Sequence, residues 1–171
     1  MAQYRPQLWS DSHLAQQGAL ENFSVNDLHP ADLRLLSSLR EPDGKIDLLL
    51  VRIPKQLAFL EDQLYRVRPH LHAGSRIFGA GMVKDIHTST LQLFERIIGP
   101  TSTSLARKRA RLIFCQFDGT SDPGQSPYPT QYQLEHTDCC LLNHANVFSR
   151  DNLDIGTRFL LEHIPASDAP L

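Results

Sequence analysis

The feature that most constrains the fold is an apolar run at residues 46–51, followed at once by a proline and an amphipathic segment. The run is interrupted only by Asp47, and its length and composition are those of a strand buried on both faces of a parallel sheet. After Pro54, which suits the first turn of a helix, apolar residues recur at steps of three and four until Pro69. The sequence therefore predicts a strand followed by a helix that packs on it, the unit from which α/β sheets are built.

Similar units lie on both sides of this one. Upstream, a polar residue at 11–12 is predicted to cap a helix, and residues 33–36 form a short strand. Downstream, residues 75–78 form a strand and residues 79–81 a turn. The next helix ends at the Gly-Pro pair at 99–100. Strands and helices thus alternate through the first hundred residues.

The remaining residues do not continue this alternation of strands and helices. Residues 110–117 are another apolar strand, and residues 118–129 are a loop rich in glycine and proline. Residues 132–136 and 139–142 are predicted to pair, and a last helix begins at Asp154. Together these elements predict an α/β sheet of doubly wound type, whose last two strands form an antiparallel, hairpin-like edge.

Charge is distributed unevenly along the chain. The 171 residues carry a formal net charge of −2, which argues against a protein that coats nucleic acid, because such proteins carry a large positive excess. Four cations nevertheless fall within five positions, at Arg107, Lys108, Arg109 and Arg111. By itself this local basic patch is either the solvated end of a helix or strand, or a surface that binds a polyanion such as RNA.

Composition argues against metal, disulfide and membrane chemistry. The three cysteines form an odd set without a Cys-x-x-Cys spacing. The pair His70 and His72 has no neighbouring acids or cysteines to complete a metal shell. No apolar run approaches the roughly 20 residues that span a bilayer, and the start of the chain lacks a signal-peptide pattern. We expect a cytoplasmic protein that binds neither metal nor membrane.

Three stretches carry a resemblance to a known family. They read DIHTSTL at residues 85–91, GPTST at 99–103 and NHANVFSRDNLDIGTRF at 143–159. With them the chain resembles the family of large-subunit ribosomal RNA methyltransferase G, and its small-subunit relative methyltransferase C. The similarity at 85–91 and 143–159 favours the large-subunit member.

The resemblance implies a protein of two tandem methyltransferase-like domains that modifies the exocyclic amine of a guanine with S-adenosylmethionine (SAM). The fold it implies is the Rossmann-like class I methyltransferase fold. Residues 1–142 would be the degenerate, RNA-handling first domain without its first strand. Residues 143–171 would begin the SAM-binding domain and stop before its glycine-rich motif. The implied partners are ribosomal RNA and the protein's own C-terminal catalytic domain.

The residues indicate that this segment is inactive by itself. A SAM site needs a glycine-rich turn after its first strand, and none follows Gly156. The family's catalytic tetrapeptide, of Asn-Pro-Pro-aromatic type, corresponds here to Arg52-Ile53-Pro54-Lys55. The amide that would accept the amine's protons and the ring that would stack on the base are both replaced. Two cations suit phosphate instead.

Two sets of residues are candidates for function. The predicted RNA-binding residues are cations along one possible surface: Arg52, Lys55, Lys84, Arg107, Lys108, Arg109 and Arg111. By resemblance, a second set lies beside the cofactor of the full enzyme: Phe148, Ser149, Asp154, Gly156 and Thr157. Locally, Asp154 is equally explained as the cap of the last helix.

Two other functional hypotheses stay open. The chain is alternatively a non-enzymatic, degenerate methyltransferase-like scaffold that binds another protein. A small hydrolase would need a nucleophile, and Cys115, His136 and Asp138 fall on neighbouring predicted strands. An apolar strand disfavours a thiolate, which counts against this arrangement.

The resemblance also carries a structural consequence. If the first strand of the family's sheet is missing, the strand at residues 46–51 loses a neighbour and exposes backbone donors and acceptors. We therefore expect a rearranged sheet, a self-associating edge or low stability.

Overall fold

The computed structural model describes residues 5–120, 122–135 and 137–165. Its centre is a four-stranded sheet of β3 (Leu48–Arg52), β4 (Arg76–Met82), β6 (Ala110–Gln116) and β5 (Thr101–Thr103), in that spatial order. β3 and β4 are parallel, whereas β6 is antiparallel to both of its neighbours. The predicted α/β class is confirmed, with a mixed rather than purely parallel sheet.

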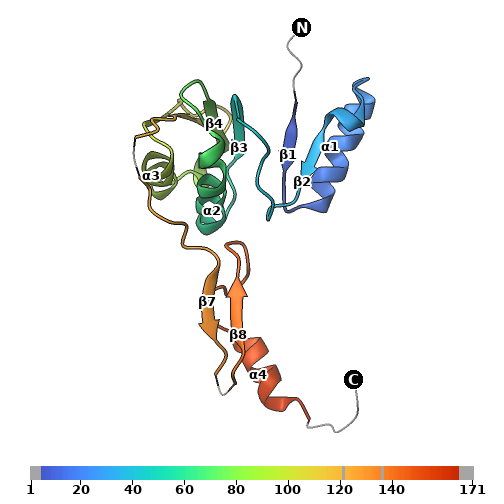
Figure 1. The fold of residues 1–171 in the computed structure, drawn as a ribbon, viewed down its shortest axis with the longest axis vertical. Coiled ribbons are helices and arrows are strands. Elements are labelled where there is room, and N and C mark those ends of the chain that lie inside the picture. The colour runs from blue at the N-terminus through green and yellow to red at the C-terminus, as the bar shows by residue number, and fades with distance from the viewer. Residues whose placement is uncertain (1–4, 121, 136, 166–171) are drawn as a thin grey trace.

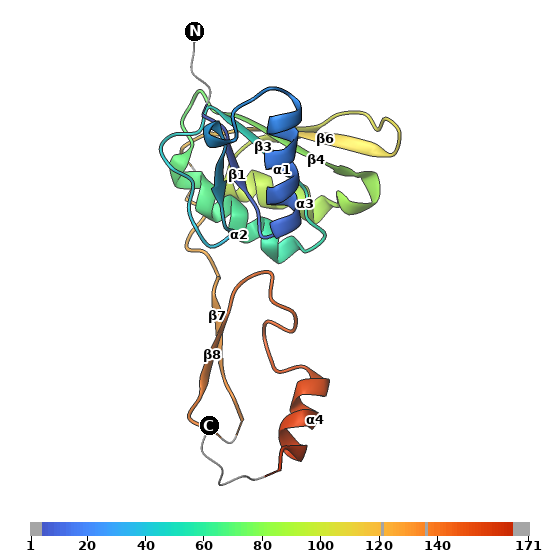
Figure 2. The ribbon, with the colours of Figure 1, turned by 90° about the vertical axis from the view of Figure 1, so that its right-hand side faces the viewer.

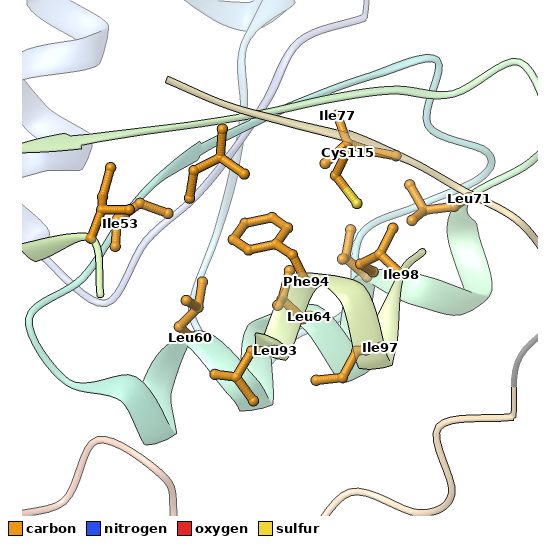
Figure 3. Packing of buried hydrophobic residues seen from close by; sticks show 13 residues of the cluster. Ile53, Leu60, Leu64, Leu71, Ile77, Leu93, Phe94, Ile97, Ile98 and Cys115 are labelled. Atoms are coloured by element: carbon orange, nitrogen blue, oxygen red, sulfur yellow. The ribbon is translucent and has the colours of Figure 1, made fainter. Parts of the chain in front are cut away.

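Two helices pack side by side on one face of this sheet, α2 (Leu57–Val67) and α3 (Thr88–Ile97). Leu60, Phe94 and Ile77 are fully buried where helices and sheet meet (Figure 3). Fully burying such side chains stabilises the fold by about 1.5–3 kcal/mol each. A 3-10 turn, Arg68–His70, follows α2, and a second one, Val83–Asp85, follows β4. The apolar spacing in the sequence thus predicted the buried stripes of both helices.

The end of α3 depends on one glycine. Gly99 has φ +149, and a Cβ placed there would lie 2.4 Å from the backbone oxygen of Gln116. Only glycine tolerates this approach, which lets the chain turn directly from α3 into β5.

The N-terminal residues form a second, smaller sheet. β1 (Gln7–Trp9) and β2 (Arg34–Leu36) are parallel and are joined through α1 (His13–Val25) and a 3-10 turn, Pro30–Asp32. The hydroxyl of Ser12 accepts a hydrogen bond from the Ala15 amide at 3.2 Å, so the predicted helix cap is confirmed. Figure 1 shows α1 on the opposite side from α2 and α3, beside β1 and β2.

The last elements leave the sheet altogether. β7 (Thr130–Gln133) and β8 (Cys140–Asn143) pair antiparallel in a separate sheet, and α4 (Ile155–His163) follows them. We call residues 130–165 the arm and residues 5–120 the body. Figures 1 and 2 show the arm extending away from the body. The pairing was predicted correctly, but its placement as an edge of the main sheet was wrong, because the proline-rich loop at 118–129 carries the chain away.

Two local predictions were also wrong. Residues 79–81 are not a turn but part of β4. Gly79 and Gly81 face the core there, and a Cβ on either would lie 3.1 Å from the side chain of Ile53, so the glycines make room for that residue. The second error concerns β3, which is not buried on both faces: Leu50 is 71% exposed.

The exposure of β3 belongs to one face of the sheet. Side chains of a strand alternate between the two faces, and Leu49 and Val51 pack against the core on the face that α2 and α3 cover. Leu48 and Leu50 lie on the opposite face, where Leu112 and Phe114 of β6 are exposed as well. β3 is also the end strand of this sheet, because β1 and β2 pair with each other instead of with it. The described strands of the body thus form two separate sheets. In the described part of the chain, no helix is long and apolar enough to cross a membrane.

Candidate nucleic-acid interface

The register of the sheet gathers cations from distant parts of the chain at one end. Arg52 ends β3 and is paired with Ala80 of β4, and Met82, the last residue of β4, is paired with Ala110, the first of β6. Because β6 runs antiparallel to β4, the basic segment before β6 lies where β3 and β4 end. Ligands of open α/β sheets bind at this end of the parallel strands.

The turn that carries Lys84 is hydrogen-bonded to the basic segment. Lys84 lies in the 3-10 turn after β4, where the amide of Val83 donates to the Arg109 carbonyl oxygen at 2.9 Å. Figure 2 shows β4 and β6 reaching together to one side of the body. We call the cations at this end of the β4–β6 pair the basic tip: Lys84, Arg107, Lys108, Arg109 and Arg111. Lys55 lies three residues beyond Arg52, on the loop after β3.

The backbone of the basic tip is strained. Arg107 and Ala110 exchange two backbone hydrogen bonds of 2.9 Å and enclose a two-residue turn. The two central residues, Lys108 and Arg109, have φ values of 48 and 64. Turns of this kind favour asparagine and glycine, since a left-handed conformation costs an ordinary L-residue roughly 1–2 kcal/mol. The turn therefore holds two long cations where smaller residues would be more stable.

The cations at this end of the sheet have no ion-pair partner among the described residues. Arg52, Lys55, Lys84, Arg107, Lys108 and Arg109 are exposed, and Arg111 is half-buried. In the ranges that the structure describes, none of the seven belongs to an ion pair. The Nε atom of Arg111 is buried without a hydrogen-bond partner. This arrangement can hold a polyanion without first breaking internal salt bridges.

The residues at the position of the family's catalytic tetrapeptide contribute to core packing and to surface charge. Ile53 is buried and contacts the glycines of β4, whereas Arg52 and Lys55 point to solvent. Arg52, which occupies the position of the family's amide, offers only donors and no acceptor for the protons of an amine.

The residues predicted to lie beside the cofactor are all on the arm. Asp154 accepts hydrogen bonds from the amides of Gly156 at 3.0 Å and Thr157 at 3.2 Å, so it caps α4 as expected. Hydrogen bonds, first of all from the Thr157 hydroxyl, lower the pKa of Asp154. Phe148 is 80% exposed, and Ser149 has φ 52.

The helix α4 has no buried residue. Its apolar side chains are exposed together with that of Phe148, and this set comprises Ile155, Phe159, Leu160 and Leu161. Such an apolar surface is typical of a protein contact.

The hydrolase arrangement does not form. Cys115 is buried in the main sheet, and burial raises the pKa of its thiol, although Thr101 opposes the shift. Asp138 lies in the arm, between β7 and β8, so the two residues are not on neighbouring strands. His136 lies outside the described residues. A protonated thiol in an apolar core is a poor nucleophile.

The two histidines of the His-x-His pair bind different parts of the protein. His70 Nδ1 is 2.9 Å from the Gly44 carbonyl oxygen, and His72 Nε2 is 3.0 Å from a carboxylate oxygen of Asp47. Within the described ranges, no group of three potential metal ligands is found. Both histidines thus have structural partners.

Comparison with solved structures defines the class of the fold. The chain resembles a 16S rRNA N2 methyltransferase of T. thermophilus, solved in complex with AdoMet and guanosine, with a TM-score of 0.61 at 15% identity over 93% of this chain and 48% of that one. It also resembles the ribosomal protein L11 methylase of Lactobacillus delbrueckii subsp. bulgaricus, with a TM-score of 0.51 at 18% identity over 65% of this chain and 57% of that one. The fold is that of a class I methyltransferase.

Sequence comparison defines the family. Residues 1–119 match the model of the RLMG N-terminal domain. The chain is 50% identical over 170 residues to the ribosomal RNA large subunit methyltransferase G of Streptomyces griseus, covering 96% of this chain and 44% of that protein. It is 42% identical to the protein of the same name from Aeromonas salmonicida, covering 97% and 44%. The chain belongs to the ribosomal RNA large subunit methyltransferase G family, and it spans less than half the length of these relatives.

Proposed function

We propose that this chain supplies the ribosomal RNA contacts of a SAM-dependent methyltransferase that modifies the exocyclic amine (N2) of a guanine in large-subunit RNA. Family membership supports the reaction class. The solved relative that holds AdoMet and guanosine supports SAM as the methyl donor and guanine as the target. The basic tip is the observation that carries the RNA-binding role, because four of its five cations are exposed and none forms an ion pair among the described residues.

The strained backbone of the basic tip supports its proposed role in RNA binding. Positive φ values at Lys108 and Arg109 reduce stability, and residues held in such conformations cluster at functional sites. A tight turn also projects both side chains beyond the end of β6. Arg52 and Lys55 extend the surface toward β3, and phosphate contacts along it would set the position of the RNA.

The division of labour follows the two parts of the chain. Residues 1–142 form the RNA-handling domain, and residues 143–171 begin the SAM-binding domain. The partners are ribosomal RNA and the protein's own C-terminal catalytic domain, in the cytoplasm. We expect the 171 residues alone to bind no SAM and to transfer no methyl group, because Arg52 and Lys55 occupy the positions of the family's acceptor amide and stacking ring.

The test measures RNA binding by the full-length enzyme carrying Arg107→Ala, Lys108→Ala and Arg109→Ala together. Each lost phosphate contact reduces the slope of log affinity against log salt by about 0.7–0.9, so the slope should fall by roughly 2–3. Arg40→Ala, an exposed cation in the loop before β3, is the matched control and should leave the slope unchanged. Equal slopes for the triple variant and wild type would refute the proposal.

A scaffold that binds another protein is the second candidate. It is favoured by the open apolar residues Leu48 and Leu50 on β3 and by the exposed face of α4. Binding through these surfaces would be insensitive to salt and to the basic tip, whereas RNA binding weakens steeply with salt. One titration series therefore separates the two candidates.

A further inference from the structure

The arm is joined to the body through a polar cluster that sequence analysis did not single out. It consists of Glu61 and Tyr65 on α2, Arg96 on α3, Tyr128 in the loop before β7, and Arg150 after β8. We call these five residues the Tyr128 cluster. A second contact, from Asn146 Nδ2 to Asp11 Oδ2 at 2.6 Å, links the arm to the start of α1.

Glu61 is the centre of the Tyr128 cluster. The Tyr128 hydroxyl donates to Glu61 Oε2 at 2.8 Å, and an Arg96 nitrogen donates to Glu61 Oε1 at 2.5 Å. Arg96 Nη1 also donates to the Tyr65 hydroxyl at 2.8 Å. Tyr65 in turn donates to the Pro123 carbonyl oxygen at 2.8 Å. Both ends of the loop at 122–129 are therefore tied to the helices of the body.

Arg150 extends the cluster into the arm. Its guanidinium lies 5.2 Å from the centre of the Tyr128 ring, and it donates to the Ala145 carbonyl oxygen at 3.2 Å. The Arg150 carbonyl oxygen accepts from Asn143 Nδ2 at 3.0 Å and from Thr130 Oγ1 at 3.3 Å. The Tyr128 side chain thus contacts a carboxylate of the body and the guanidinium of Arg150, a residue whose backbone carbonyl oxygen is hydrogen-bonded to both strands of the arm.

The hydrogen bonds of the cluster are directional and partly shielded from water. The side chain of Glu61 is only 19% exposed. Burial and the neighbouring Glu61 carboxylate hold the pKa of Tyr128 well above its usual range, so the hydroxyl keeps the proton that it donates. Hydrogen bonds to a charged acceptor are roughly twice as strong as neutral ones, and this geometry fixes the direction of the arm as well as its attachment.

We propose that the Tyr128 cluster fixes the angle between the body and the arm, so that RNA held by the basic tip is presented to the SAM-binding domain that begins within the arm. This inference rests on the proposed function. Tyr128 is a positioning residue, because it touches neither the RNA-binding cations nor any cofactor. The role differs from general stabilisation, since Glu61, Arg96 and Tyr128 lie outside the hydrophobic core.

The first test measures the arm directly in the full-length enzyme. Spin labels are placed on Cys139, with Cys140→Ser and any further exposed cysteines replaced, and on Gln92→Cys, an exposed position of α3. Tyr128→Phe removes only the hydroxyl, and the ratio of docked to undocked arm should fall about ten-fold. The distribution of distances between the labels should broaden accordingly. Tyr132→Phe, on β7, is the matched control and should retain the wild-type distribution.

The second test separates positioning from binding. For Tyr128→Phe, turnover at saturating RNA should fall in proportion to the docked fraction that the label distances give, while the dissociation constant for RNA changes less than two-fold. Glu61→Gln keeps an acceptor for Tyr128 but loses the charge, so its effects should be intermediate. An unchanged distance distribution, or a broadened one with unchanged turnover, overturns the inference. The distance measurement uses no RNA, so it stands independently if the basic tip proves not to bind RNA.

Discussion

The basic tip and the Tyr128 cluster are both rich in cations, but the protein treats those cations in opposite ways. In the cluster, Arg96 and Arg150 each meet a carboxylate and each lie over a tyrosine ring. In the basic tip, Arg107 and its neighbours meet no carboxylate among the described residues, and the backbone between them is strained. The ion-paired cations of the Tyr128 cluster stabilise the contact between body and arm, whereas the cations of the basic tip can bind a polyanion from outside the protein.

The difference follows from where each set is built. The Tyr128 cluster lies over two packed helices, where neighbouring side chains shield its charges from water and strengthen their hydrogen bonds. The basic tip lies at the end of a projecting strand pair, where water and salt screen each charge. Exposed cations contribute little to stability there, which leaves them available for RNA.

The largest expected effect comes from relieving the strained turn. Replacing Lys108→Asn and Arg109→Gly supplies the residues that the turn favours, and should raise the free energy of unfolding by about 1–2 kcal/mol. The same double variant should bind RNA more weakly, with a salt slope lower by roughly 1.5–2. Chemical denaturation and RNA titration measure the two effects. A variant that gained stability without losing affinity would remove the functional explanation of the strain.

The converse change in the Tyr128 cluster should reduce stability. Glu61→Ala leaves Arg96 and the Tyr128 hydroxyl without their acceptor, and should cost about 1–2 kcal/mol after allowance for the partial exposure of Arg96. The affinity for RNA should stay within two-fold of wild type. Urea denaturation checks the first expectation, and Asp32→Ala, an exposed carboxylate near β2, is the control.

A smaller effect is expected at the open strand. Leu50 is exposed on β3, so Leu50→Ser should change the free energy of unfolding by no more than about 0.5 kcal/mol. It should nevertheless reduce self-association of the isolated 171 residues, because the apolar edge strand offers a template for another chain. Analytical ultracentrifugation compares the two proteins. Ile77 is buried on the neighbouring strand, so the control Ile77→Ala should lower the free energy of unfolding by about 2–5 kcal/mol. This contrast shows that the small effect is specific to the exposed position 50.

Sequence alone predicted the elements whose signals are local. The helices α2 and α3 and the strand β6 were found because their apolar spacing and flanking prolines and glycines lie within the elements themselves. The predicted turn at 79–81 was wrong because glycine occurs both in turns and in strands where another side chain packs closely. Only the contact of Ile53 with Gly79 and Gly81 shows that the second case applies here. The predicted burial of β3 on both faces was wrong because the sequence of a strand does not show which elements cover each face of its sheet.

The candidate sites differ in the same way. The four cations of 107–111 are adjacent in sequence and were visible at once, but their meeting with Lys84 depends on the pairing of β4 with β6. The Tyr128 cluster joins Glu61 to residues 35 and 67 positions away. The only local signal was a tyrosine between two prolines, Pro127 and Pro129, in a loop that otherwise resembles plain surface.

The smallest expected effect concerns pH and distinguishes the two regions by titration. The folded protein raises the pKa of Tyr128 above its usual value of 10, chiefly through burial and the Glu61 carboxylate. The neutral hydroxyl is therefore favoured by folding, so the stability that it contributes is complete below pH 10 and is lost as the pH rises through the folded value. Ultraviolet titration should show one tyrosine that ionises later than the others, and Tyr128→Phe should abolish that late step. If the late step persists in this variant, it belongs to another tyrosine. Tyr128 would then be more exposed to water than its hydrogen bond to Glu61 implies.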